Sequence, residues 1–239
     1  MPLSPAHHPF ASSRLPFRIR SGALACLVAA GLVSALPANA SSVSDAPNDF
    51  IASFLGAHSP DLDVLSAFAT FDGTTFQIGG TVNAPVGTLP SALYVFGFNR
   101  GAGNTNFAAI GHAGVVFDAV ITMTGAGVLG GRDLVSNTPI AVPGTGHISG
   151  SSFSIDVPAS LLPSQGLSFA QYAVNLWPRD ASVAAGATQI SDFAPDNADF
   201  TVSTVEAIPE PGTQALFVLG LAGMAGVLRR RRGAAARTG

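Results

Sequence analysis

The spacing of turn-forming residues in the middle of the chain constrains its fold most. Between residues 41 and 206, Gly, Pro, Asn or Asp interrupts short apolar runs at intervals of about 8 to 12 residues, a pattern typical of all-β domains. A segment of this length buries enough apolar surface to fold without disulfide bonds. We therefore predict an all-β fold, an antiparallel, jelly-roll-like β-sandwich, as one domain over residues 41–206.

The clearest strand pair is predicted around the dipeptide Asp72-Gly73. This dipeptide suits a two-residue turn with positive φ, so it is expected to join strands over 64–71 and 74–82. In that register, one large side chain faces one small side chain at each core position: Ala69 and Phe76, Ala67 and Ile78, Leu65 and Gly80. One face of the hairpin is therefore expected to pack on the core.

Further strands are predicted along the rest of the domain. Five segments have suitable composition: 91–99, 115–124, 152–157, 167–177 and 199–205. The first two are apolar on both faces, so we expect them in the centre of a sheet. Residues 158–163 begin and end with proline and predict a turn or a single helical turn.

One short helix is predicted near the start of the domain, over residues 47–56. Proline opens this segment and glycine ends it, as at many helix ends. Its large apolar residues recur at helical spacing: Phe50, Ile51, Phe54 and Leu55. We expect this helix to cover one sheet.

The first 40 residues have the three parts of a secretory signal peptide. Arginines precede an apolar run over 22–36, and Ala38-Asn39-Ala40 provides the small residues of a cleavage site. The run is shorter than the roughly 20 residues of a membrane span, so we predict cleavage after Ala40. Cys26, the only cysteine, leaves with the signal peptide. Disulfides, zinc-thiolate sites and cysteine nucleophiles are thereby excluded from the mature protein.

The C-terminal part of the sequence predicts a membrane-spanning segment. Residues 213–228 are apolar, and as a helix they reach about 24 Å, enough to cross a thin bilayer. Four arginines follow at once: Arg229, Arg230, Arg231 and Arg232. Since such a cluster resists translocation, residues 233–239 are expected to form a cytoplasmic tail, with the domain on the other side of the membrane.

Pro209, Glu210 and Pro211 stand immediately before this span. In this order, the three residues, the span and the arginines resemble the PEP-CTERM sorting signal of Gram-negative bacteria, over residues 207–232. The resemblance implies cleavage near Pro209 to Pro211 by an exosortase-type membrane protease, which acts with the export machinery. It also implies delivery to the cell surface or extracellular matrix, often in producers of exopolysaccharide. The alternative is a plain tail anchor, which hydropathy alone allows.

The domain itself resembles exported domains that accompany such tails. The resemblance lies in four stretches: 61–67, 94–101, 175–180 and 190–197. It implies no assigned activity and no catalytic residues. Residues 41–208 contain 13 acidic residues against three arginines, a net charge of −10. This excess of negative charge excludes nucleic acid as a partner, because phosphate binding needs a basic face.

No catalytic constellation is evident in the sequence. A G-x-G-x-x-G pattern occurs without the helix that a dinucleotide site needs after it, at Gly125, Gly127 and Gly130. The G-x-S-x-G elbow of serine hydrolases is absent. We therefore expect no enzymatic activity. The alternative is a polysaccharide-acting hydrolase that uses paired acids such as Asp118 and Asp156.

Two runs of acidic residues supply oxygen ligands of the kind that Ca²⁺ takes. One contains Asp192, Asp196 and Asp199, and the other contains Asp61 and Asp63. Neither run has the glycine and terminal glutamate of an EF-hand. The alternative is a solvated acidic face, which needs no cofactor.

The one ligand surface that the sequence predicts surrounds Trp177, the only tryptophan. In the strand predicted over 167–177, it shares a mixed face with polar residues and is followed by charged ones: Gln171, Asn175, Arg179 and Asp180. Trp rings stack on sugars, so extracellular polysaccharide is the expected partner of such a face. The alternative is that Trp177 caps the core. The sequence thus predicts an exported structural or binding module without a defined ligand.

Overall fold

The computed structural model describes residues 41–205 and 220–222. In these residues short strands and single turns of 3₁₀ helix follow one another in the order β1 (Ser41–Ser44), η1 (Pro60–Leu62), β2 (Val64–Phe71), β3 (Thr75–Val82), β4 (Ala92–Asn99), η2 (Ala108–Ile110), β5 (Ala119–Thr124), β6 (Leu129–Asp133), β7 (Thr138–Pro139), β8 (His147–Ser149), β9 (Ser152–Pro158), η3 (Ala159–Leu161), η4 (Phe169–Gln171), β10 (Ala173–Asp180), η5 (Ala187–Gln189), β11 (Phe200–Thr201) and β12 (Ser203–Thr204). The predicted all-β class is confirmed.

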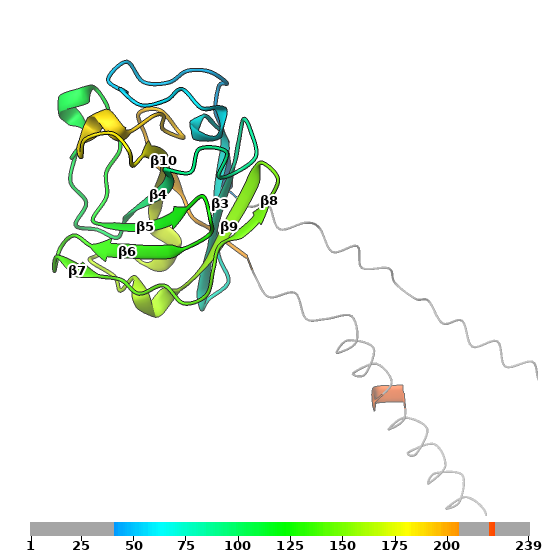
Figure 1. Cartoon of the computed structure of the whole chain (residues 1–239). Helices are drawn as coiled ribbons and strands as arrows, with labels where there is room; N and C mark the ends of the chain where they lie inside the picture. The colour runs from blue at the N-terminus through cyan, green and yellow to red at the C-terminus, as the bar shows by residue number, and fades with distance from the viewer. Residues whose placement is uncertain (1–40, 206–219, 223–239) are drawn as a thin grey trace, which may run out of the picture. The chain divides into compact units, whose positions relative to one another are not determined.

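The strands form two sheets that face each other (Figure 1). Sheet A has the order β1-β2-β3-β9-β8, with β12 also paired to β2, and sheet B has the order β11-β10-β4-β5-β6-β7. All pairings are antiparallel except that of β12 with β2. The main core lies between the sheets and includes fully buried aromatic rings from both: Phe76, Tyr94, Phe96, Phe98 and Tyr172. The predicted β-sandwich is therefore confirmed.

The β2–β3 hairpin exists, but its register differs from the predicted one. Ala69 pairs with Ile78 and Phe71 pairs with Phe76, a shift of two residues along β3. The Asp72 carboxylate accepts the backbone N–H groups of Thr74 and Thr75, both at 2.8 Å, and so widens the turn. An even shift keeps each side chain on its predicted face, because side chains alternate with a period of two.

The predicted N-terminal helix over 47–56 is wrong, since this segment contains turns and no helix. Asn48 has a φ of 65°, which a right-handed helix cannot accommodate. The backbone N–H of Ile51 donates to Ser191 O and that of Leu55 donates to Thr188 O. Hydrogen bonds to a distant loop thus replace the local bonds that a helix would make.

The strand predicted over 167–177 begins later than expected. A 3₁₀ turn, η4, precedes it and is closed by reciprocal hydrogen bonds between Ser168 and Gln171. The strand β10 then runs from Ala173 to Asp180 and pairs with β4 along its whole length. Both central strands predicted as apolar on two faces, β4 and β5, do lie inside sheet B.

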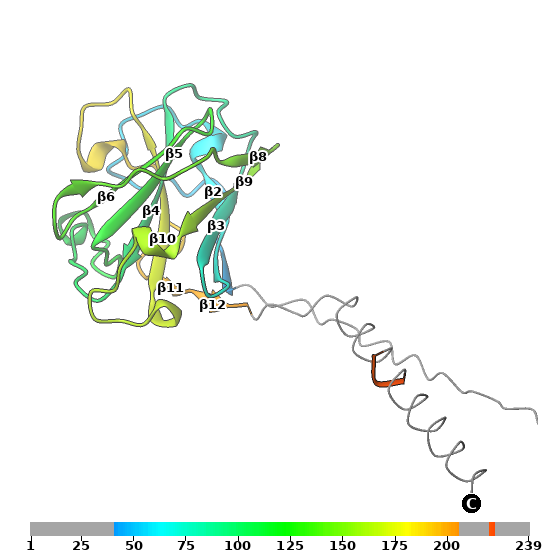
Figure 2. The same ribbon diagram turned by 90° about the horizontal axis from the view of Figure 1, so that it is seen from below.

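The two ends of the domain lie at one edge of sheet A. β1 and β12 both pair with β2 on the side opposite β3, and Figure 2 shows β11 and β12 at the same end of the sandwich. The backbone N–H of Ser41 donates to Ser203 Oγ. The first strand of the domain and the last strand before the sorting motif are therefore neighbours.

The predicted signal peptide and nearly all of the predicted span at 213–228 lie outside the described residues. Residues 220–222 are helical. Among the residues that are described, no helix is long and apolar enough to cross a membrane.

Candidate functional site

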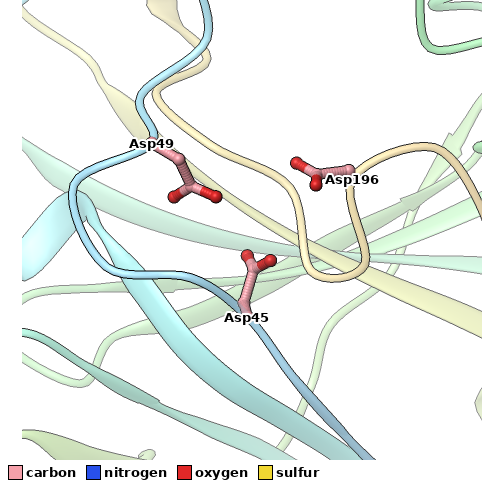
Figure 3. Close-up of side chains that lie close together, drawn as sticks. All are labelled: Asp45, Asp49 and Asp196. Atoms are coloured by element: carbon pink, nitrogen blue, oxygen red, sulfur yellow. The ribbon is translucent and has the colours of Figure 1, made fainter.

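Five aspartates from three separate segments converge beside sheet A, and we call them the acid cluster: Asp45, Asp49, Asp63, Asp192 and Asp196. Asp45, Asp49 and Asp196 each place one carboxylate oxygen within 4.8 Å of those of the other two, and Asp49, Asp63 and Asp192 do the same. Figure 3 shows the side chains of the first triad pointing toward one another. Asp49 belongs to both triads and links them.

Asp63 and Asp192 are the anchored members of the acid cluster, and their side chains are wholly buried. The Asp63 carboxylate accepts the backbone N–H of Asn48 at 2.9 Å and the side-chain amide of Asn83 at 2.8 Å. Asp192 accepts the backbone N–H of Val64 at 2.8 Å. These bonds hold the segment after β1 and the loop after β10 against the start of β2.

Two oxygens of the acid cluster have no partner. Asp45 Oδ2 and Asp49 Oδ1 are buried and accept no hydrogen bond from any described residue. A buried polar atom left without a partner costs about 1–3 kcal/mol. The cluster therefore contains acceptors that the described protein atoms leave unused.

Burial and mutual repulsion make the carboxylates of the cluster hard to ionise together. Burial and the charge of Asp49 raise the pKa of Asp45 to about 7. Burial, with the charges of Asp45 and Asp49, raises the pKa of Asp192 to about 8. The same kinds of cause raise the pKa of Asp49. Among the residues that the structure describes, no arginine or histidine forms an ion pair with the cluster.

The cluster is open to solvent on one side. Asp49 and Asp196 line a surface depression together with Ile110 and His112. His112 Nδ1 contacts the backbone oxygen of Asp196, and its ring lies on that of Phe193 with centroids 4.4 Å apart. A small cation thus has a path from solvent to the carboxylates.

The structure brings together part of the predicted calcium set. Asp192 and Asp196 belong to the acid cluster, whereas the Asp199 carboxylate faces the backbone N–H of Val116, at 3.2 Å from Oδ2. Burial raises the pKa of Asp199 to about 7. Asp61 is also directed elsewhere, because its Oδ2 accepts the backbone N–H of Leu89. Sequence reasoning missed Asp45 and Asp49, since nothing in the sequence shows that residues nearly 150 positions apart meet.

The ligand-binding surface predicted around Trp177 is buried in the structure. The Trp177 side chain is 1% exposed and lies in a second hydrophobic cluster on the outer face of sheet B. Phe107, Phe117 and Phe193 surround its ring. Trp177 therefore caps a core, as the alternative held, because two loops cover this face of the sheet.

The polar residues predicted beside Trp177 serve the fold. Asn175 is buried, and its amide donates to Pro195 O and Ala198 O. Asp180 is buried and accepts the hydroxyl of Ser91 at 2.8 Å. Gln171 caps η4, and Arg179, whose pKa burial lowers, lies in β10. These residues do not form a common binding face.

The paired acids of the hydrolase alternative lie in different sheets. Asp118 is buried beside β5 of sheet B and forms an ion pair with Arg100. Asp156 is in β9 of sheet A, where it accepts the Gln77 amide and lies 3.7 Å from the exposed ring of His147. Among the described residues, Asp118 and Asp156 make no contact with each other and line no common pocket.

The C-terminal part of the chain defines its class: an exported protein that is sorted at the membrane. Residues 207–232 match the protein family described as the PEP-CTERM protein-sorting motif. This match contains the predicted Pro209-Glu210-Pro211 and the arginines at 229–232. A motif of this kind implies processing by an exosortase. Comparison with curated proteins and with solved structures found no match.

Proposed function

We propose that this chain is a cell-surface or extracellular-matrix protein whose β-sandwich is a non-enzymatic structural or binding module. The sorting motif at residues 207–232 carries the proposal, since such a motif serves to deliver the domain before it. The two ends of the domain meet at the edge of sheet A beside β2. Cleavage at both ends therefore leaves the sandwich with its edge strands in place.

The arrangement of ionisable groups supports a non-enzymatic role. A glycosidase needs two carboxylates flanking one cleft, about 5 to 9.5 Å apart. Asp118 is instead neutralised by Arg100, and Asp156 lies on the other sheet. His147 and Asp156 form an exposed pair to which no serine hydroxyl of the described residues is hydrogen-bonded.

Polysaccharide binding is the second candidate function. Its candidate site is now a groove on the outer face of sheet A, instead of the surroundings of Trp177. A shallow groove there is lined by the ring of Phe68 and by polar side chains of three strands, among them Thr81, His147, Ser152 and Ser154. Thr81 and Ser152 hydroxyls lie 3.1 Å apart. An aromatic ring beside hydroxyl and imidazole groups matches the apolar face and polar rim of a sugar.

Processing in the native host tests the proposal at both ends. Intact-mass measurement of the accumulated surface form should show Ser41 as the first residue and no Arg229–Arg232. A variant with Glu210→Ala should instead accumulate with its tail uncut in the membrane fraction. Persistence of the arginine cluster in the wild-type surface form would contradict exosortase processing.

A glycan array then separates the structural role from the binding role. If the sheet A groove binds polysaccharide, the exported protein should retain specific glycans, and Phe68→Ala should release them. Trp177→Ala is the wrong variant for this purpose, because loss of a buried Trp costs about 3–5 kcal/mol and unfolds much of the protein. Absence of any glycan signal would favour the structural module.

A further inference from the structure

The acid cluster contains more negative charge than the described protein atoms can stabilise. Five aspartates meet, and two of them, Asp63 and Asp192, have wholly buried side chains. Of the three arginines of the domain, Arg100 pairs with Asp118 and Arg132 donates to Asn137, and Arg179 forms no ion pair with a described carboxylate. Buried charges are normally paired or bound to a metal ion.

A second and independent observation is the pair of oxygens without partners. Asp45 Oδ2 and Asp49 Oδ1 are buried atoms that accept no hydrogen bond from described residues, and the side chains of Asp45 and Asp49 point toward each other and toward Asp196 (Figure 3). Simple clustering of surface acids would leave such oxygens in water. A cation held between the two carboxylates would satisfy both oxygens.

The chemistry and the number of the donors indicate the kind of ligand. All donors in both triads are carboxylate oxygens, which bind hard cations such as calcium and magnesium, whereas zinc and copper favour nitrogen and sulfur ligands. Magnesium is usually held by one or two carboxylates and keeps several waters, whereas calcium takes six to eight oxygen ligands. Three carboxylates in each triad therefore suit calcium better than magnesium.

We propose that the acid cluster is a calcium site that fastens the N-terminal segment of the mature domain to the loop after β10. Asp45 and Asp49 follow β1 directly, Asp63 precedes β2, and Asp192 and Asp196 lie in that loop. One ion at Asp49 would add a link between segments that hydrogen bonds already hold together, such as those from Asn48 to Asp63 and from Ile51 to Ser191. Solvent access between Asp49 and Asp196 gives the ion its route of entry.

The site matches the compartment that the sorting motif implies. Extracellular calcium modules bind with dissociation constants of about 10⁻⁴ to 10⁻³ M, which suits the calcium outside cells. The domain would then complete its N-terminal segment after export. The binding itself depends only on the five carboxylates, so it can be tested apart from processing.

The test is a calcium titration of the exported protein after treatment with EDTA. At calcium about 100 times the dissociation constant, linkage predicts a rise in Tm of about 5 to 10 °C. Calorimetric titration should show saturable calcium binding, with magnesium much weaker. No change in Tm at calcium concentrations up to about 100 mM, which is 100 times the weakest expected dissociation constant, or an equal response to magnesium, would overturn the assignment.

Two matched variants locate the binding. Asp49→Asn removes the carboxylate that both triads share and should abolish the calcium-induced rise in Tm. Asp156→Asn alters an exposed aspartate outside the cluster and should leave the rise unchanged. If Asp49→Asn fails to melt cooperatively in EDTA, Asp45→Asn takes its place, because Asp45 also has an unpartnered oxygen. Equal loss in cluster and control variants would overturn the proposal.

Discussion

Two groups of buried carboxylates in this domain meet the same physical problem in opposite ways. In sheet B, the Arg100 guanidinium lies 2.6 Å from Asp118 and 2.9 Å from Asp133. We call these three residues the arginine group. In the acid cluster, five carboxylates meet without any cation from the described residues. The first group has its counter-charge within the chain, whereas the second has none among the described residues and is the site that we propose for calcium.

The pKa shifts of the two groups differ in sign accordingly. In the arginine group, burial works against ionisation, but hydrogen bonds from Ser136 and Arg100 lower the pKa of Asp133. In the acid cluster, burial outweighs the hydrogen bonds from backbone N–H groups and raises the pKa of Asp45 and Asp192, because no cation of the described residues assists those bonds. Burial alone therefore does not identify a site. What identifies it is burial without a counter-charge.

The largest expected effect comes from making the arginine group resemble the acid cluster. Arg100→Met removes the one cation that the described residues place beside Asp118 and Asp133. Breaking a buried ion pair in this way costs about 3–5 kcal/mol. Urea denaturation should show this loss of unfolding free energy with and without calcium.

Arg132→Met is the matched control for this change. Arg132 is exposed, and its guanidinium donates to Asn137 rather than to a carboxylate. Its loss is expected to cost about 0.5 kcal/mol or less, as at most surface positions. A loss for Arg100→Met no larger than for Arg132→Met would mean that Asp118 and Asp133 need no counter-charge.

An intermediate effect is expected from pH in the absence of calcium. Asp45 and Asp192 have pKa values of about 7 and about 8 in the folded domain, above those of the unfolded chain. Between about pH 4 and pH 8 the folded state therefore holds more protons, and its stability must fall as pH rises. We expect a fall of about 1–3 kcal/mol between pH 5 and pH 8 in EDTA.

The arginine group acts with the opposite sign, because the lowered pKa of Asp133 contributes stability that is lost only as pH falls below about 4. Asp199 lies outside the cluster but also has a raised pKa, so the measurement is best repeated in an Asp199→Asn background. Calcium should reduce the fall, because metal binding favours ionised carboxylates. Stability that is constant or rising from pH 5 to pH 8 in EDTA would contradict the prediction.

Much of the fold could be predicted because its signals are local. Alternating apolar residues on β2 and β3 face the core as expected, and Asp72-Gly73 does mark the turn. The exact register depended on the Asp72 side chain, which accepts two backbone N–H groups and widens the turn. At the start of β2 an irregularity buries Val64 in place of Leu65, a detail that alternation alone does not contain.

The acid cluster and the predicted helix illustrate what the sequence could not supply. Residues 47–56 have helical spacing, yet hydrogen bonds to Ser191 and Thr188 hold them in turns. The same tertiary contacts bring Asp49 beside Asp192. Trp177 was ambiguous for a similar reason: whether a strand face is covered depends on loops from distant parts of the chain. Local sequence patterns therefore predicted the strands. The acid cluster could not be predicted, because it depends on contacts between distant parts of the chain.

The smallest expected effect is that of Asp45→Asn, and it tests the difference between the acid cluster and the arginine group most directly. Asp45→Asn removes one charge from the acid cluster while keeping the shape of the side chain. In EDTA it should raise the unfolding free energy by about 0.5 kcal/mol, because exposed or partly buried charge pairs contribute on this scale. The equivalent change in the arginine group, Asp118→Asn, should lower it by about 1.5–3 kcal/mol, since Arg100 loses a charged hydrogen bond. Saturating calcium should reverse the order for Asp45→Asn, which then becomes less stable than the wild type. If Asp45→Asn is destabilising in EDTA as well, the carboxylates of the cluster are structural acceptors rather than ligands waiting for a cation.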